Sequence, residues 1–538
     1  MGIKYYFQFF IIISLLYSLK IDTKAQDSLY LVGTIIGESN EKRITNVKGI
    51  GDINTDGYDD FMVAVNTGLN VKGQGIVKLY LGSADGNLTH DVIFHYPGKD
   101  SLYDFGGTIS GVGDVNGDDY DDFIIWGLFS DWGYWKGKVF LYLGGSSIDT
   151  LPVKEFYEPW IQDSFGYITE AVGDINKDGY DDFITCSHYN WSDGKGYVYL
   201  FWGGDTISWE KCDTISGNLF FPQSAANIGD INNDGFDDIA IGTSKNPLNA
   251  DSCKVYIYYG GNQVNTEPDT ILFPNKDTYE FGRIIKNAGD INGNGVSHFF
   301  IVSGNYVFLY SVKNNPVTIN GSLLGLGGYI NIESNLNMNN DDYTDFVIGN
   351  TNYKNSDDVM VGGAFLYLGG SEIDTNYIYK LEGENKWDEF SKIMSHSDMN
   401  DDSYDEIFIL APNYPDYENP LGKVYIYSHK KFTGIKDYKG NIPNNLKLYQ
   451  NYPNPFNPTT ILSWQLEIRS IVKISIYDVL GREVTTILNE EQPAGEYEIE
   501  FDASEYNLSS GIYFYELSIG SFGKTKDNAL HRKMVLLR

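Results

Sequence analysis

The stretch "GDINTDGYDDFMV", residues 51–63, places four acidic residues within nine positions and runs directly into an apolar segment. With Asp52 counted as position 1, oxygen-bearing side chains stand at positions 1, 3, 5 and 9, and a glycine stands at position 6: Asp52, Asn54, Asp56, Asp60 and Gly57. Three interpretations are open for such a stretch: a metal-binding loop, a cluster of catalytic carboxylates, or a solvated turn before a strand. One copy does not choose among them.

The pattern occurs seven times in the chain. Further copies begin with "GDVNGDDYDDFII" at Gly113, "GDINKDGYDDFIT" at Gly173, "GDINNDGFDDIAI" at Gly229 and "GDINGNGVSHFFI" at Gly289, and two looser copies are "NMNNDDYTDFVI" from Asn337 and "SDMNDDSYDEIFI" from Ser397. A period of about 60 residues is typical of a repeat architecture.

Each copy is accompanied by further landmarks. A β-branched and aromatic segment that ends in glycine follows most loops, as in "GIVKLYLG" (75–82) and "GKVFLYLGG" (137–145), and predicts a strand. A Phe-Gly pair precedes several loops, at Phe105-Gly106, Phe165-Gly166 and Phe281-Gly282. We therefore expect each repeat to run strand, acidic loop, strand, variable loop, strand, glycine turn, strand. Seven such units predict an all-β fold, a seven-bladed β-propeller over residues 27–430.

These motifs resemble the FG-GAP repeats of the integrin α-chain propeller, which also occur in many bacterial secreted proteins. The resemblance covers roughly residues 27–430 and depends on the three landmarks occurring in a fixed order. It implies that the acidic loops lie in β-hairpins and bind calcium.

The loop chemistry suits calcium, which takes six to eight oxygen ligands in a tight turn. Side chains at positions 1, 3 and 5 would point inward, position 7 would offer a carbonyl, and the acid at position 9 would close the shell. We predict several structural Ca²⁺ ions, about four to six. The candidate ligands are Asp52, Asn54, Asp56, Tyr58 and Asp60; Asp114, Asn116, Asp118, Tyr120 and Asp122; Asp174, Asn176, Asp178, Tyr180 and Asp182; Asp230, Asn232, Asp234, Phe236 and Asp238; Asn337, Asn339, Asp341 and Asp345; and Asp398, Asn400, Asp402 and Glu406.

The copies are unequal. The loop that begins at Asp290 has His298 where the closing acid belongs, so we expect weak binding or none. The loop at Asn337 opens on two amides and should bind weakly, and the loop at Asp398 has Ser403 in place of glycine.

Position 8 also carries an acid in several loops, as Asp59, Asp121, Asp181 and Asp237. General acid–base catalysis would need paired carboxylates in a pocket with separated pKa values. Four equivalent pairs, each inside a loop, argue against catalysis there; plain solvated turns remain an alternative.

The face opposite the acidic loops is the candidate ligand-binding face. If each loop joins the first and second strands, the next loop and the interblade connection must emerge on the other side. Aromatic residues in those segments suit glycan stacking or protein recognition, and the resemblance to integrins implies a ligand-binding role for the same face. The alternative is that these rings pack the loops against one another. The candidates are Trp132, Tyr134, Trp135, Trp160, Tyr189, Trp191, Tyr414 and Tyr417.

Composition excludes several partners and indicates no enzyme. A net charge of −34 makes nucleic acid and anionic membranes poor partners. The motifs G-x-S-x-G, H-E-x-x-H and G-x-x-x-x-G-K-[ST] are absent, so we expect no catalytic activity. A propeller lyase or hydrolase with isolated Arg, Lys or Tyr groups remains possible. The three cysteines, Cys186, Cys212 and Cys253, fit buried thiols rather than disulfides or a zinc site.

The N-terminus reads as a secretory signal peptide, residues 1–25. Lys4 precedes the apolar run 5–19, and Thr23 and Ala25 follow at cleavage-compatible spacing. The run is too short to span a membrane comfortably, and no later segment is long and apolar enough.

The C-terminus reads as a linker, residues 431–445, followed by a small Ig-like β-sandwich over 446–538. This tail resembles the C-terminal sorting domain of the type IX secretion system. The matching segments are Asn451–Pro458, "IYDVLGREV" (476–484), Ala494-Gly495, Ser510–Tyr513 and "KMVLLR" (533–538). The resemblance implies the type IX machinery as a partner and a secreted or cell-surface location; an ordinary Ig-like accessory domain is the alternative.

The sequence thus predicts a secreted, calcium-binding propeller that binds a glycan or protein. The alternatives are a secreted polysaccharide-acting enzyme on the same scaffold and a structural surface component without a specific ligand.

Overall fold

A computed structural model defines the fold. It describes residues 29–537 except 38–42, 67–74, 97–101, 132–133, 159–164, 191–193, 218–220, 244–252, 275–279, 312–313, 320–328, 431–446, 467–469, 480–481, 493–494, 505, 507 and 521–527. The predicted signal peptide and linker therefore lie outside the described residues. The contacts divide the chain into two compact units, Met1–Ile435 and Lys436–Arg538.

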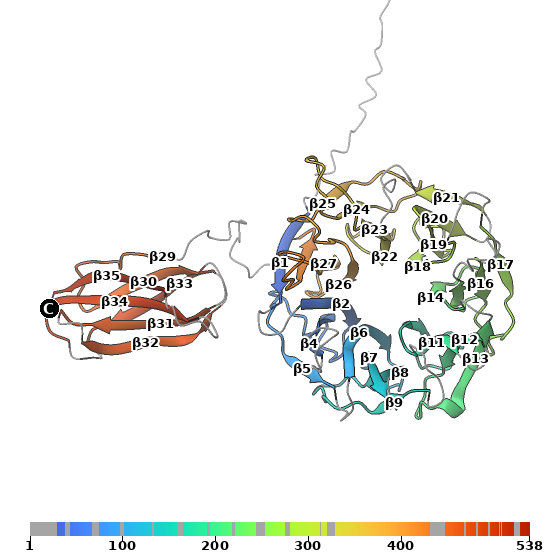
Figure 1. Cartoon of the computed structure of the whole chain (residues 1–538), viewed down its shortest axis with the longest axis horizontal. Coiled ribbons are helices and arrows are strands. Elements are labelled where there is room, and N and C mark those ends of the chain that lie inside the picture. Colours follow the sequence, from blue (N-terminus) through green and yellow to red (C-terminus); the bar gives the residue numbers. More distant parts are fainter. Residues whose placement is uncertain are drawn as a thin grey trace, which may run out of the picture. The chain divides into compact units, whose positions relative to one another are not determined.

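Seven four-stranded antiparallel sheets surround the centre of the first unit as blades 1 to 7 (Figure 1). Six blades are built from consecutive strands, with the first strand innermost. They are β2 (Arg43–Gly51), β3 (Asp60–Asn66), β4 (Ile76–Tyr80) and β5 (Val92–His95); β6 (Leu102–Gly113), β7 (Asp122–Asp131), β8 (Tyr134–Tyr142) and β9 (Lys154–Phe156); β10 (Thr169–Gly173), β11 (Asp182–Asn190), β12 (Lys195–Phe201) and β13 (Cys212–Gly217); β14 (Ser224–Gly229), β15 (Asp238–Gly242), β16 (Val255–Tyr258) and β17 (Thr270–Leu272); β18 (Ile284–Gly289), β19 (His298–Ser303), β20 (Tyr306–Ser311) and β21 (Asn314–Ile319); β22 (Ile330–Leu336), β23 (Asp345–Asn350), β24 (Gly363–Tyr367) and β25 (Tyr379–Glu382). A short 3₁₀ helix, Trp209–Lys211, precedes β13.

Blade 7 combines the two ends of the propeller. Its inner strands are β26 (Ile393–Ser397), β27 (Glu406–Ala411) and β28 (Lys423–Ser428), and its outermost strand is β1 (Tyr30–Ile36). β1 pairs antiparallel with β28, from Tyr30 opposite Ser428 to Ile36 opposite Lys423. This closure joins the first strand to the last blade, so the ring leaves no open junction. The repeat pattern did not reveal it, because β1 precedes the first acidic loop.

The predicted order of strands within a blade is confirmed. Each acidic loop connects the first and second strands, and the residue at position 9 begins the second strand, as where Gly51 pairs with Asp60. Left-handed backbone at Thr55 and Gly57 reverses the chain within the loop. The core lies between neighbouring blades, where Phe61 stacks on Phe408 of blade 7 with ring centroids 4.7 Å apart.

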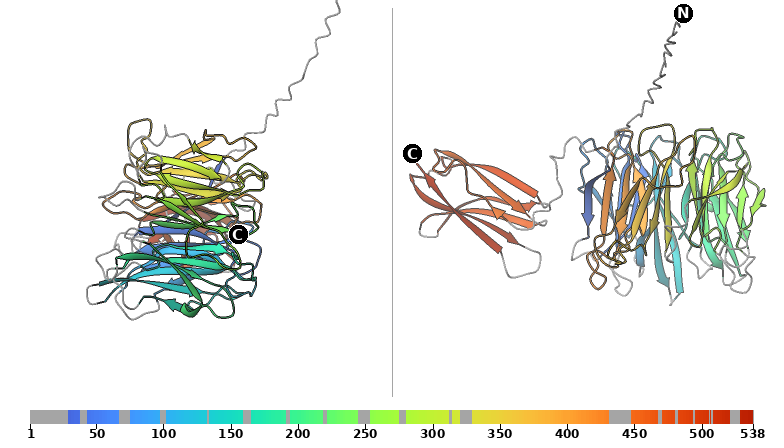
Figure 2. Two further views of the ribbon diagram at one scale, coloured as in Figure 1. Left: turned by 90° about the vertical axis from the view of Figure 1, so that its right-hand side faces the viewer. Right: turned by 90° about the horizontal axis from the view of Figure 1, so that it is seen from above.

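The second unit is a β-sandwich, as predicted (Figure 2). One sheet has the order β29 (Lys447–Leu448), β30 (Thr459–Leu466), β33 (Gly495–Asp502), and the other has β32 (Glu483–Gln492), β31 (Ser470–Tyr477), β34 (Gly511–Gly520), β35 (Asn528–Leu536). Trp464, Ile474, Tyr515 and Met534 lie in the buried core between them. Cys186 and Cys253 are buried and Cys212 is partly buried, in keeping with the expected buried or half-buried thiols.

Candidate functional site

The acidic loop of blade 1 is closed by hydrogen bonds to its own side chains. The carboxylate of Asp52 accepts the backbone N–H groups of Asp56 and Gly57, at 3.1 and 2.8 Å. Asn54 accepts the N–H of Asp56 at 2.9 Å, and Asp56 accepts that of Tyr58 at 3.1 Å. The side chains at positions 1, 3 and 5 are thereby folded against the turn. The loops that begin at Asp114, Asp174 and Asp230 repeat these bonds.

The acid at position 9 has a role that the sequence analysis did not foresee. Asp60 is fully buried, and its two oxygens accept the N–H of Ile53 at 3.1 Å and that of Gly82 at 2.8 Å. Gly82 follows the third strand, β4, so this carboxylate ties the loop to the next hairpin of its blade. Burial raises the pKa of Asp60 to about 8, although both backbone hydrogen bonds favour the anion.

Four other blades repeat this tie between an aspartate and a glycine. In each of these blades the carboxylate at position 9 accepts the N–H of a glycine after the third strand, which is Gly144, Gly203, Gly260 or Gly369. Burial raises the pKa of each of these carboxyl groups to about 7. The aspartates are Asp122, Asp182, Asp238 and Asp345. The glycine after the third strand and the acid at position 9 are thus the donor and the acceptor of one recurring hydrogen bond.

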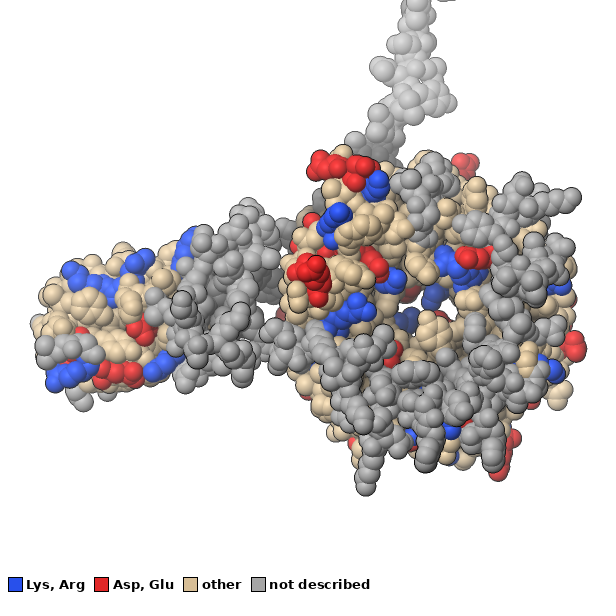
Figure 3. Space-filling view, viewed as in Figure 1, with Lys and Arg blue, Asp and Glu red and all other residues tan. Residues whose placement is uncertain are grey.

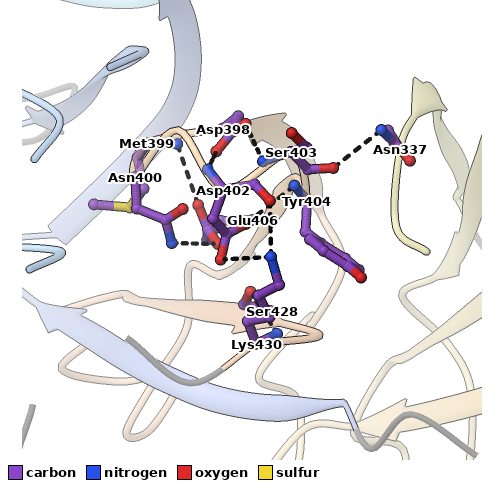
Figure 4. Close-up of polar contacts among 10 residues, drawn as sticks. All are labelled: Asn337, Asp398, Met399, Asn400, Asp402, Ser403, Tyr404, Glu406, Ser428 and Lys430. Atoms are coloured by element: carbon purple, nitrogen blue, oxygen red, sulfur yellow. Dashed lines mark hydrogen bonds and ion pairs between the residues drawn. The ribbon is translucent and has the colours of Figure 1, made fainter. Parts of the chain in front are cut away.

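Blade 7 replaces both residues. Glu406 stands at position 9, and His429 stands where the other blades have the glycine, one residue after Ser428. Glu406 accepts the N–H of Met399 at 3.1 Å and the side-chain amide of Asn400 at 3.3 Å, and a hydrogen bond with Ser428 favours its anion (Figure 4). Burial dominates and raises the pKa of Glu406 to about 9. The longer Glu406 side chain thus reaches Ser428, the residue before that position.

The acids at position 8 link neighbouring blades. Asp121 of blade 2 accepts the N–H of Asp52 in blade 1 at 3.0 Å, and Asp181 of blade 3 accepts that of Asp114 in blade 2 at 2.9 Å. Asp59 likewise accepts the N–H of Asp398, and Asp405 that of Asn337. Asp237 instead accepts the Asn227 amide at 2.9 Å. These carboxylates are structural acceptors, which explains their repetition without catalysis.

The oxygen donors of the loops fit a hard cation. Carboxylates, amide oxygens and a position-7 carbonyl are ligands that calcium prefers. Asp182 Oδ2 and Asn400 Oδ1 are buried and have no hydrogen-bond partner within the described residues, so they are available to a cation. Within the same residues, however, no three Asp, Glu, His or Cys side chains converge as a metal-holding group. A bound ion would therefore depend on amide and carbonyl oxygens as well as acids.

The acidic loops of blades 5, 6 and 7 depart from the common pattern in different ways. In blade 5, His298 is buried and its Nδ1 has no partner in the described part of the chain. In blade 6, Asn337 replaces the aspartate at position 1 and contacts Asn340 N at 2.9 Å. In blade 7, Lys430 donates to the Asp402 carbonyl at 2.9 Å, and its ammonium lies 3.8 Å from the Asp402 carboxylate (Figure 4). An ammonium already neutralises part of that loop.

Most of the predicted aromatic candidates lie outside what the structure describes. Trp132, Trp160 and Trp191 are outside the described residues, and for Tyr134, Trp135 and Tyr189 only the strand position is described, in β8 and β11. Tyr417 is 69% exposed. Tyr414 is half-buried against the core, and Lys423 Nζ lies 4.7 Å from its ring centroid. Tyr414 thus packs its own loop.

Comparison with known proteins identifies relatives of both units. Residues 450–528 match the family described as "Secretion system C-terminal sorting domain". Integrin alpha-6 of Gallus gallus is 36% identical over 142 residues, 24% of this chain and 12% of the relative. Integrin alpha-7 of Rattus norvegicus is 32% identical over 169 residues, 30% of this chain and 14% of the relative. Integrin alpha-V of Gallus gallus is 26% identical over 211 residues, 36% of this chain and 19% of the relative.

These similarities bear out the two sequence resemblances. The chain carries an integrin-α-like FG-GAP propeller and a secretion sorting domain. It spans less than a fifth of the length of the integrin relatives given above. The sorting domain indicates a secreted protein or one on the outer cell surface. Within the described residues, no helix has the length and apolar character needed to cross a membrane.

Proposed function

We propose that this protein is a calcium-stabilised propeller that binds a glycan or protein ligand outside the cell. The observation that carries the proposal is the division of labour between the two faces. On the loop face, acids at positions 8 and 9 are occupied as acceptors for backbone N–H groups, as Asp121 and Asp60 show. The opposite face carries exposed rings such as Tyr417 and Tyr167. In this proposal the acidic-loop face stabilises the fold, and the opposite face binds the ligand.

Calcium would act as a structural ion in this proposal. In blade 1 the holders would be Asp52, Asn54, Asp56, the Tyr58 carbonyl and Asp60, with corresponding sets in blades 2 to 4. Bound Ca²⁺ supplies positive charge that offsets the repulsion between adjacent carboxylates. The chain's own contribution is the left-handed turn and the buried position-9 acid.

Binding, rather than catalysis, is the proposed activity. The position-9 carboxyl groups with raised pKa values are buried and accept backbone hydrogen bonds, as Asp122 does. These carboxylates are engaged with the backbone of their own blade. The secretion machinery is the partner implied by the C-terminal sorting domain.

A glycan array with the full chain, in calcium and in EDTA, tests the proposal. We expect calcium-dependent binding that is lost when Trp132, Trp135 and Trp191 are changed to Ala. Tyr452→Ala is the control, because this ring is 81% exposed in the C-terminal unit. New reducing or unsaturated ends on a polysaccharide would instead show an enzyme. No binding to any glycan or extracellular protein would favour a purely structural role.

A further inference from the structure

The centre of the propeller contains a ring of charged side chains from the innermost strands. Four charged residues occupy equivalent positions on the first strands of their blades. Each pairs with the residue two places after position 9 on the second strand: Lys48 with Met62, Glu170 with Ile184, Lys286 with Phe300 and Glu333 with Val347. Four different blades therefore direct alternating charges to one level of the channel.

The ring is partly paired and keeps one uncommitted cation. Lys286 Nζ lies 3.6 Å from the Glu170 carboxylate, and His396 Nδ1 lies 2.8 Å from that of Glu333. Lys48 is close enough to lower the pKa of Glu333 but forms no ion pair with any described residue. Its ammonium acts on the Glu333 carboxylate and can also attract an added anion.

A polar cavity of about 170 Å³ opens beside this ring. Both cations and both acids of the ring line it, Lys48, Lys286, Glu170 and Glu333, together with the amides and hydroxyls of Asn46, Thr108, Thr169 and Asn331. Figure 3 shows the hollow at the propeller's centre, with basic side chains at its edge. Hydroxyl and amide groups next to ammonium groups suit a ligand that carries both sugar hydroxyls and negative charge.

At the mouth of the channel, an exposed tyrosine lies between two cations from adjacent blades. Tyr329 immediately precedes β22 and is 66% exposed. Arg283 precedes β18, and its guanidinium carbon lies 5.8 Å from the Tyr329 ring centroid; Lys392 precedes β26, and its Nζ lies 4.6 Å from the same centroid. Tyr167, which precedes β10, adds a second ring that is 61% exposed.

The two cations differ in how firmly they are held. Lys392 lies 3.1 Å from Glu389 and both side chains are more than a third exposed, so a ligand carboxylate can compete for this surface ion pair. Arg283 is only 16% exposed, lies 3.6 Å from Glu280 and also donates to the Ile330 carbonyl at 3.1 Å, so its guanidinium is held in a fixed place beside Tyr329. The mouth lies at the start of the innermost strands, on the face away from the acidic loops, so an anionic ligand avoids their repulsion.

We propose that this channel mouth binds an acidic polysaccharide through its uronate carboxylates. Arg283 and Lys392 form charge-assisted hydrogen bonds with a carboxylate, Tyr329 contacts the sugar ring, and Lys48 and Lys286 attract the next charge toward the channel. This proposal rests on the proposed binding function and names its ligand class. It also places recognition at residues that the aromatic-loop prediction did not include.

Binding of oligogalacturonides of defined length to the full chain tests the proposal. Isothermal titration at two salt concentrations compares the wild type with Arg283→Gln/Lys392→Gln, Tyr329→Ala and Lys48→Gln. We expect the double variant to lose about tenfold or more in affinity, because charge-assisted hydrogen bonds are lost. The matched control is Lys154→Gln/Lys211→Gln, which removes two exposed charges elsewhere and should leave affinity within about twofold.

Two further ligands separate this proposal from the broader one. Oligo-glutamate probes an acidic peptide, and malto-oligosaccharides probe a neutral glycan. Binding of oligo-glutamate as tight as that of oligogalacturonide would overturn the glycan assignment. Binding of neutral glycans alone would overturn the acidic class and leave the proposed function standing. No binding to any glycan or protein would refute both.

Discussion

The acidic loops of blades 1 and 5 reach the same turn by different means. Both open on an aspartate that accepts the N–H at position 6, from Gly57 at 2.8 Å in blade 1 and from Gly295 at 2.6 Å in blade 5. At position 9 they diverge, because Asp60 bridges to Gly82 whereas His298 stands where no glycine follows the third strand. The first aspartate shapes the turn, and the ninth residue decides whether the loop is fastened to the rest of its blade.

Blade 5 still forms the full four-stranded sheet. Its stability comes from apolar packing, since Phe300 is fully buried and its ring lies 4.8 Å from that of Phe346 in blade 6. Burial lowers the pKa of His298, although Asp290 opposes this. The imidazole is therefore neutral at physiological pH and supplies no charge in place of the missing acid. The apolar cores therefore suffice to form the blades, and the loop hydrogen bonds add further stability.

Calcium removal should have the largest effect and should separate the complete loops from that of blade 5. A ligand that binds only the folded state stabilises it by about 3–4 kcal/mol per site at 100 to 1,000 times its Kd. We expect the melting temperature of the full chain to fall when EDTA replaces calcium, measured by differential scanning calorimetry. Equal melting temperatures in the two buffers would refute calcium as a structural ion.

Changing position 9 should sharpen the comparison further. Asp60→Asn places an amide group against the N–H groups of Ile53 and Gly82, and each unsatisfied buried donor costs about 1–3 kcal/mol. We expect a loss of about 2–4 kcal/mol in urea unfolding, together with a smaller calcium-induced shift. His298→Asn is the matched variant, and it should change stability by about 1 kcal/mol or less. A similar loss in both variants would show that the tie to Gly82 adds nothing specific.

Much of the propeller fold and of its acidic loops could be predicted from the sequence, because the repeat determines local features. The loop residues, the glycine-ended strands and the seven-fold period predicted the blades and their strand order. Two features could not be predicted from the sequence. β1 lies before the first repeat, so its place in blade 7 follows only from ring closure. The pairing of Asp60 with Gly82 joins residues whose partnership is visible in the sequence only as a correlation: the two blades without an aspartate at position 9, which have Glu406 and His298 there, also lack the glycine after the third strand.

The channel residues were missed for a different reason. Arg283, Tyr329 and Lys392 follow no motif, because each comes from a separate blade at a position that the repeat leaves free. Only the closed ring brings them together. A signal existed in hindsight, since the residue after Phe-Gly is Tyr167 in one repeat and Arg283 in another, whereas the landmarks around it are kept.

Blades 1 and 5 agree at one position, where Lys48 and Lys286 occupy the same level of the channel ring. Burial alone would raise the pKa of Glu333, but Lys48, His396 and Lys286 lower it from an ordinary value of 4.5 to about 2, despite Glu170 and Asp405 nearby. This carboxylate therefore stabilises the fold above about pH 4.5, and its contribution is lost as the pH falls toward 2.

Glu333→Gln should remove that acid-dependent step. We expect the variant to be less stable than the wild type by about 2 kcal/mol at pH 6, and the difference to shrink on acidification to pH 3. Urea unfolding at several pH values measures it. A difference that stays constant with pH would mean that Glu333 acts by packing rather than by charge.

The smallest expected effect concerns the links between blades. Asp121→Asn replaces one acceptor of the Asp52 N–H, at a boundary that the backbone also bridges where Gly145 N donates to the Ile53 carbonyl at 2.7 Å. Because the boundary keeps that bond and its apolar core, we expect a loss of about 1 kcal/mol. Blade 5 offers the matched change, Ser297→Ala, which removes a hydroxyl that makes no such link and should be nearly silent. Native-state hydrogen exchange at the Asp52 amide reports the local effect directly: protection should fall in Asp121→Asn while distant blades keep theirs. Uniform loss of protection around the ring would instead show that the position-8 carboxylates hold the propeller closed as one cooperative unit.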